Sequence, residues 1–107
     1  MIRITYSCKN YEVKVKGHAN CAPKGEDPIC AGISTLTMTL SCALKQAKEQ
    51  GIITDLDVEM TDGKTHIKAV PKEGYEENVR TIFTTIFNGY DAFSLDFPEY
   101  VSFKPAG

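Results

Sequence analysis

Hydrophobic and polar residues alternate at the beginning of the chain. Every second residue is hydrophobic over residues 2–7, starting at Ile2, and residues 11–16 repeat the pattern. A period of two places successive side chains on opposite faces of a strand. The two segments therefore predict two half-buried β-strands, joined by a turn at residues 8–10.

A helical pattern replaces this alternation after a loop at residues 17–27. Asp27 can cap a helix, Pro28 is tolerated in its first turn, and Gly51 is a natural stop. We therefore predict a helix over about residues 28–50. Its hydrophobic stripe consists of residues three or four positions apart: Ile29, Ile33, Leu36, Leu40, Leu44 and Ala47.

The second half of the chain shows two more strands. Hydrophobic residues alternate with acidic ones over residues 55–60, and residues 64–70 predict a return strand. Asp62-Gly63 lies between them and is a strong signal for a tight hairpin turn.

A second helical stripe follows this hairpin. It contains Val79, Ile82, Phe83, Ile86, Phe87, Tyr90, Phe93 and Phe97. The spacing continues through Asn88-Gly89, so we expect one helix that ends at about residue 96. Residues 101–103 then predict a short final strand.

These elements define the expected fold class. Their order is ββαββαβ, which predicts an α+β two-layer sandwich with one mixed or antiparallel sheet and two long helices. The length of 107 residues fits a single domain spanning residues 1–107.

Composition and charge narrow the function classes. The net charge is −2, whereas nucleic-acid-binding proteins usually carry a basic excess, so we expect no direct binding of nucleic acid. Residues 28–44 are uncharged but too rich in hydroxyl side chains for a membrane span, and no signal peptide is visible. We expect a cytoplasmic protein with free thiols at all four cysteines: Cys8, Cys21, Cys30 and Cys42.

Cys30 and His18 are the candidates for chemistry. Cys30 falls in the first turn of the predicted helix, where unpaired N–H groups and the helix dipole favour a thiolate over a thiol. His18 begins the preceding loop, and imidazole can accept a thiol proton near neutral pH. If the loop folds back, base and nucleophile meet. The alternative for Cys30 is a buried structural cysteine.

Two neighbouring polar residues have open roles. Asp27 is either a helix cap or a group that orients His18. Ser34 lies one turn after Cys30 and either reaches the thiol or bonds back to a carbonyl. A zinc site at His18, Cys21 and Cys30 would lack a fourth ligand, so we expect neither a metal nor another cofactor.

The loop and helix start together form a recognisable motif. Its residues are Gly17, His18, Ala19, Gly25, Asp27, Cys30, Ala31 and Ser34. The pattern resembles the ribosomal-processing cysteine protease family called Prp, and the ending at residues 97–100 is compatible with it. Gly32 departs from the small alanine expected there, and Cys21 is an additional thiol.

This resemblance implies a definite activity. It implies a homodimeric cysteine endopeptidase with Cys30 as nucleophile and His18 as base; Asp27, Ser34 and Gly25 would have supporting or substrate-binding roles. The substrate would be the N-terminal extension of a bacterial large-subunit ribosomal protein, number twenty-seven, cut after an aromatic pair. The loop between His18 and Cys30 would be mobile.

Two other functions remain open. One is a non-catalytic ribosome-assembly or binding module, in which His18 and Cys30 are structural. The other is a thiol redox sensor that uses Cys30 and Cys21 as attacking and resolving thiols.

Overall fold

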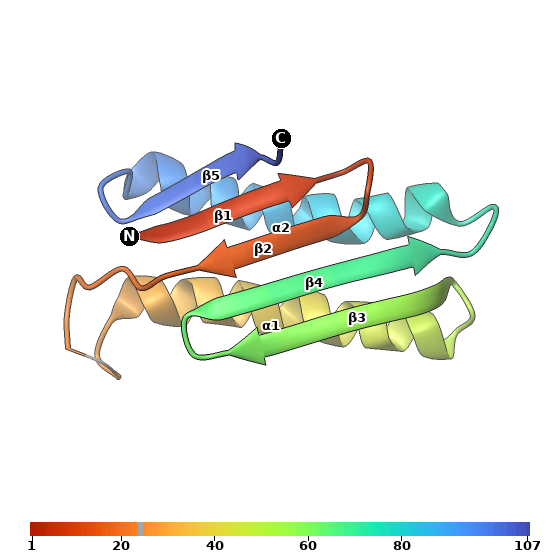
Figure 1. Ribbon diagram of the computed structural model, residues 1–107, viewed down its shortest axis with the longest axis horizontal. Helices are drawn as coiled ribbons and strands as arrows, with labels where there is room; N and C mark the ends of the chain where they lie inside the picture. The colour runs from red at the N-terminus through yellow and green to blue at the C-terminus, as the bar shows by residue number, and fades with distance from the viewer. Residues whose placement is uncertain (24) are drawn as a thin grey trace.

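The computed structural model describes residues 1–23 and 25–107 and contains the elements in the predicted order. They are β1 (Ile2–Ser7), β2 (Glu12–Lys16), α1 (Pro28–Glu49), β3 (Ile53–Thr61), β4 (Lys64–Pro71), α2 (Glu76–Asp96) and β5 (Val101–Pro105). Figure 1 shows these elements along the chain. The ββαββαβ order is thereby confirmed.

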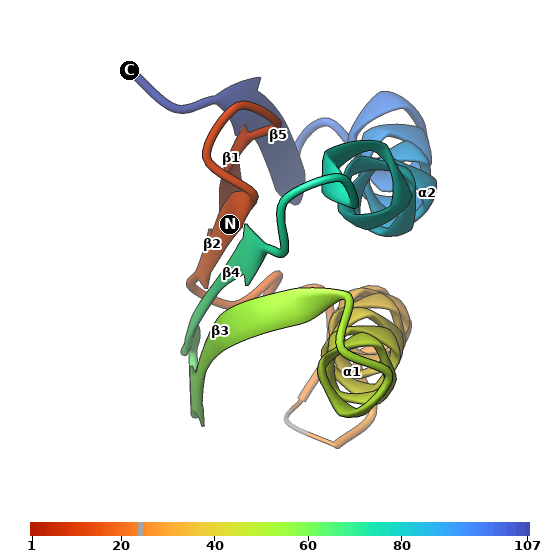
Figure 2. The same cartoon turned by 90° about the vertical axis from the view of Figure 1, so that its right-hand side faces the viewer.

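The strands form one mixed sheet in the order β3-β4-β2-β1-β5. β5 pairs with β1 in parallel, and the other neighbours are antiparallel. Both helices cover the same face of the sheet (Figure 2). This arrangement confirms the α+β two-layer sandwich. Neither helix in the described part of the chain is long and apolar enough to span a bilayer.

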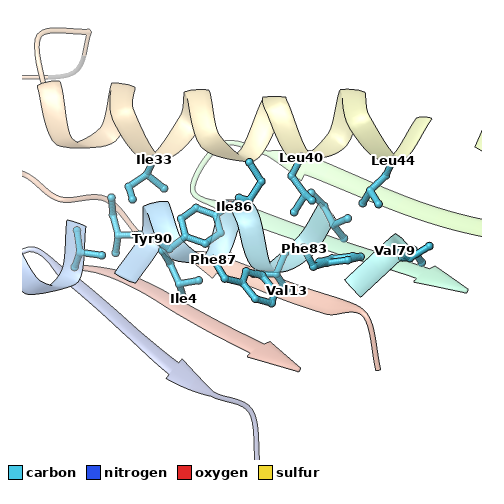
Figure 3. Packing of buried hydrophobic residues seen from close by; sticks show 14 of the residues in the cluster. Ile4, Val13, Ile33, Leu40, Leu44, Val79, Phe83, Ile86, Phe87 and Tyr90 are labelled. Carbon is cyan, nitrogen blue, oxygen red and sulfur yellow. The ribbon is translucent and has the colours of Figure 1, made fainter. Parts of the chain in front are cut away.

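The hydrophobic stripes of sheet and helices meet in one core (Figure 3). Its largest fully buried side chains are Tyr90, Phe83, Ile4, Leu40, Leu44, Ile67, Val13, Val79 and Val101. Tyr90 is a polar exception, and its hydroxyl lies 2.7 Å from that of Thr37. Burial raises the pKa of Tyr90 to about 12, so this pair stays neutral and links the two helices.

Two glycines allow the helices to approach closely. A methyl group at Gly32 of α1 would lie 2.3 Å from the Phe93 ring, and one at Gly89 of α2 would lie 2.8 Å from Leu36. The glycine at position 32 is therefore explained by packing. Gly89 also leaves α2 unbroken, as its hydrophobic spacing predicts.

Two strand boundaries differ from the prediction. β2 begins at Glu12 because Tyr11 has a positive φ of 52° and belongs to the turn. β3 begins at Ile53, two positions before the predicted start at residue 55, because the pairing register shifts between Ile53 and Asp55. A bulge of this kind interrupts the alternation that marks a strand in the sequence.

The face of the sheet opposite the helices is polar. His66 of β4 is half-buried there, because it pairs with Glu12 of β2. The hydrogen bond with His66 lowers the pKa of Glu12. The edge strand β3 presents exposed acids at Asp55, Asp57 and Glu59.

Candidate active site

The N-terminus of α1 is organised by Asp27. This side chain is only 8% exposed. Its Oδ1 accepts hydrogen bonds from the backbone N–H groups of Ile29 and Cys30, each 3.0 Å long. Asp27 is therefore the helix cap, as predicted, and it places Cys30 in the first turn.

The Cys30 thiol is half-buried and faces the loop that precedes α1. The backbone N–H of Ala19 donates to Cys30 Sγ over 3.4 Å, and Ala19 itself is buried. The loop thus folds back onto the helix start. His18 is the residue immediately before Ala19, so both proposed catalytic residues lie in one small region.

Cys21 is a second link between the loop and α1. Its backbone N–H donates to Asp27 Oδ2 over 3.1 Å, and its thiol donates to Oδ1 over 2.9 Å. The Cys21 thiol and then the Cys30 amide lower the pKa of Asp27 to about 2, so the cap stays charged down to very acidic pH. The same hydrogen bond raises the pKa of Cys21.

His18 lies against the turn between β3 and β4. Its Nε2 is 3.8 Å from Asp62 Oδ1, and a methyl group at Gly63 would lie 2.7 Å from Nε2. The Gly17 N–H donates to the Gly63 carbonyl over 2.9 Å. Figure 1 shows this turn at the same end of the sheet as the loop before α1.

These elements enclose a cleft of about 530 Å³. All five site residues named from the sequence line it: His18, Gly25, Asp27, Cys30 and Ser34. Ile2, Val15, Ile33 and Met60 provide apolar surface. The cleft therefore combines a thiol, an imidazole and a hydrophobic wall.

The structure bears on the roles that the sequence left open for Asp27 and Ser34 and on the zinc site. Asp27 directs its oxygens to Cys21 and to the helix amides, which supports the cap role. The Ser34 hydroxyl lines the cleft and makes no hydrogen bond to the residues the structure describes. No group of three His, Cys, Asp or Glu side chains among those residues could hold a metal ion.

Sequence reasoning missed two contributors to this site. The Ala19 N–H reaches the thiol, and Asp62 faces the imidazole. Asp62-Gly63 was recognised only as a hairpin signal, because a pattern within one hairpin does not report which distant loop packs against it. Strand order, which brings β4 next to β2, supplies that information.

A thiol at a helix N-terminus, with an imidazole and a backbone N–H donor nearby, defines the class of nucleophilic thiol hydrolases. The family model for the cysteine protease Prp matches residues 1–102, and the chain belongs to this family of cysteine proteases. No curated protein sequence matches the chain.

Solved structures share the fold. The essential ribosomal processing protease Prp from S. aureus, with a covalently linked product peptide, is 21% identical and has a TM-score of 0.78; the match covers 99% of this chain and 100% of that one. Its complex with a substrate peptide is 19% identical, has a TM-score of 0.71 and covers 98% and 97%.

The protein SMU.848 from Streptococcus mutans also resembles this chain. It is 28% identical, has a TM-score of 0.72, and the match covers 98% of this chain and 93% of that one. The similarity of all three structures extends over nearly the whole of this chain.

Proposed function

We propose that this protease removes the N-terminal extension of a bacterial large-subunit ribosomal protein, number twenty-seven, by cutting after an aromatic pair. Cys30 is the nucleophile and His18 is the base. The observation that carries this proposal is the Cys30 thiol at the start of α1, in contact with the loop that bears His18. The family's ribosomal processing members supply the substrate class. The reaction would take place in the cytoplasm.

The proposed reaction is acyl transfer. His18 takes the proton of Cys30, the thiolate attacks the scissile carbonyl, and the imidazolium gives its proton to the leaving amine. Water then hydrolyses the acyl-enzyme and restores the thiol. The Cys30 N–H is occupied by Asp27. The Ala19 N–H is an amide donor beside the sulfur, where it can hold the developing oxyanion.

The cleft also suits the proposed specificity. Ile2, Val15, Ile33 and Met60 offer an apolar lining near Cys30. Aromatic side chains gain the most from burial against such surface. An aromatic pair before the scissile bond would therefore be bound on this side of the cleft.

Incubation with the ribosomal protein precursor tests the function. Mass spectrometry should find a single cut after the aromatic pair, in reducing buffer and without added metal. A precursor with both aromatics replaced by alanine is the matched control and should remain uncut. An intact precursor after prolonged incubation would refute the proposed substrate.

The structure supports the thiol redox sensor less well than the peptidase. A resolving thiol must reach the thiolate state, but the hydrogen bond to Asp27 raises the pKa of Cys21. Cys21 instead fastens the loop to the helix cap.

We also propose that the protein is a homodimer. α2 packs against Gly32 and Leu36 of α1 and leaves an uncharged face of α1 uncovered. A shallow groove on this face is lined by Thr35, Met38, Thr39, Cys42, Ala43 and Gln46, and Met38 is 58% exposed. A second copy would cover this apolar surface.

Sedimentation at micromolar concentration should therefore show a dimer. Met38→Glu should shift it to a monomer, because the charge would have to be buried in the interface. Thr85→Glu on the exposed surface of α2 is the control and should leave the dimer intact. A monomeric wild-type protein would rule out this interface.

The loop at residues 19–26 is proposed to close over the substrate as a lid. Residue 24 lies outside the described residues. Ala19 and Cys21 tie the first part of the loop to α1, whereas Pro23, Gly25 and Glu26 are exposed. Closure would complete the Cys30–His18 contact and exclude water.

Hydrogen exchange measures this closure. The loop amides other than those of Ala19, Cys21 and Glu26, which donate hydrogen bonds, should exchange fast in the free enzyme. They should exchange at least about ten-fold more slowly with a non-cleavable substrate peptide, because binding adds contacts to exposed backbone. Amides in the middle of α1, such as that of buried Leu40, should not change. Equal protection of the loop in the free and the peptide-bound enzyme would show that the loop does not move when substrate binds.

A further inference from the structure

A carboxylate faces the imidazole of His18, and it is not the one that the sequence suggested. Asp62 Oδ1 lies 3.8 Å from His18 Nε2. Asp27, the candidate from the sequence, is committed to Cys21 and to the start of α1. Among the described residues, Asp62 has the carboxylate that pairs with His18.

The backbone holds this turn against the histidine. The Gly17 N–H, one residue before His18, bonds to the carbonyl of Gly63, one residue after Asp62. Gly63 has a φ of +74° and no Cβ, and the imidazole occupies the space that a Cβ would need. Loop and turn therefore keep a fixed relation, and Asp62 stays beside the ring.

The contact between His18 and Asp62 determines which imidazole nitrogen can act as the base. Neutral imidazole carries one proton, so a carboxylate that accepts from Nε2–H leaves Nδ1 as the basic nitrogen. The gap of 3.8 Å exceeds a hydrogen bond, but catalytic contacts commonly shorten when substrate binds.

We infer that Asp62 is a positioning residue for His18, an inference that rests on the proposed role of His18 as the base. Asp62 holds the Nε2–H tautomer and orients the ring. The Cys30 proton then moves from Sγ to Nδ1, Asp62 faces the resulting imidazolium without taking its proton, and Nδ1–H passes to the leaving amine. The thiol–imidazole pair thereby gains an orienting carboxylate from the β3–β4 turn.

Kinetics on a short peptide substrate test the inference. Asp62→Ala should lower kcat about ten-fold and leave KM within about two-fold. The loss in kcat is smaller than the 10²–10⁴-fold that a general base supplies, because the His18 and Asp62 side chains are 48% and 68% exposed and water weakens their interaction. Asp62→Asn should recover most of this loss, because the amide oxygen still accepts from Nε2–H. Asp57→Ala, which removes an exposed acid from β3, the strand that leads into this turn, is the control and should behave as wild type.

A spectroscopic readout separates positioning from a general structural effect. The ¹⁵N shifts of His18 should show the Nε2–H tautomer in wild type, Asp57→Ala and Asp62→Asn, and a mixture in Asp62→Ala. If Asp62→Ala keeps both the wild-type kcat and the tautomer, the inference is overturned, while loss of activity in His18→Ala would still support the proposed function. If His18→Ala retains full activity, the proposed base itself fails.

Discussion

Replacing Cys30 by alanine is expected to abolish peptide cleavage and to leave a folded protein. Loss of a catalytic nucleophile costs kcat a factor on the order of 10⁶. The fold should survive because Cys30 is only half-buried and alanine removes only the sulfur, which accepts a hydrogen bond from the Ala19 N–H. The Asp27 cap bonds the Cys30 backbone, which alanine retains.

Cleavage of a fluorogenic peptide and circular dichroism measure the two parts of this prediction. Cys8→Ala is the matched control, since Cys8 is a free thiol in the turn after β1, away from the cleft and from the groove on α1. It should retain full activity. A Cys30→Ala protein with normal circular dichroism and full activity would remove Cys30 from the mechanism.

Replacing His18 by alanine is expected to lower kcat by about 10²–10⁴-fold, the usual contribution of a general base. Without the imidazole, the thiol proton must go to water or buffer. The effect on folding should be small, because about half of the His18 side chain is exposed. Peptide cleavage at neutral pH is the measurement.

His66→Ala is the control for this change. His66 is on β4, and its partner is Glu12 on the sheet face opposite the helices. The variant should cleave at the wild-type rate even if it is somewhat less stable. A wild-type rate for His18→Ala would exclude this residue as the base.

Most of the fold can be predicted from patterns of neighbouring residues. The stripes on both helices were sufficient to place α1 and to extend α2 through Gly89, because the core side of a helix repeats at a fixed spacing. The starts of β2 and β3 were missed for local reasons. Tyr11 adopts a conformation that its side chain does not signal, and the register shift after Ile53 breaks the alternation.

The candidate site also has parts that neighbouring residues predict and parts that they do not. The cap at Asp27 and the position of Cys30 follow from neighbouring residues, so the sequence predicted both. The contact of His18 with Asp62 joins residues from two separate segments, and it depends on β4 lying beside β2. The bond from Cys21 to Asp27 depends on the path of the loop, which has no periodicity to interpret.

The two edges of the sheet have a consequence for how molecules of this protein meet. β3, at one edge, presents Asp55, Asp57 and Glu59, while β5, at the other, is short and ends with Lys104 and Pro105. Charged or proline-bearing edges resist pairing with a strand from another molecule. Edge-to-edge pairing of sheets from many molecules into a continuous, amyloid-like ribbon is therefore disfavoured, and a concentrated solution should remain free of fibrils.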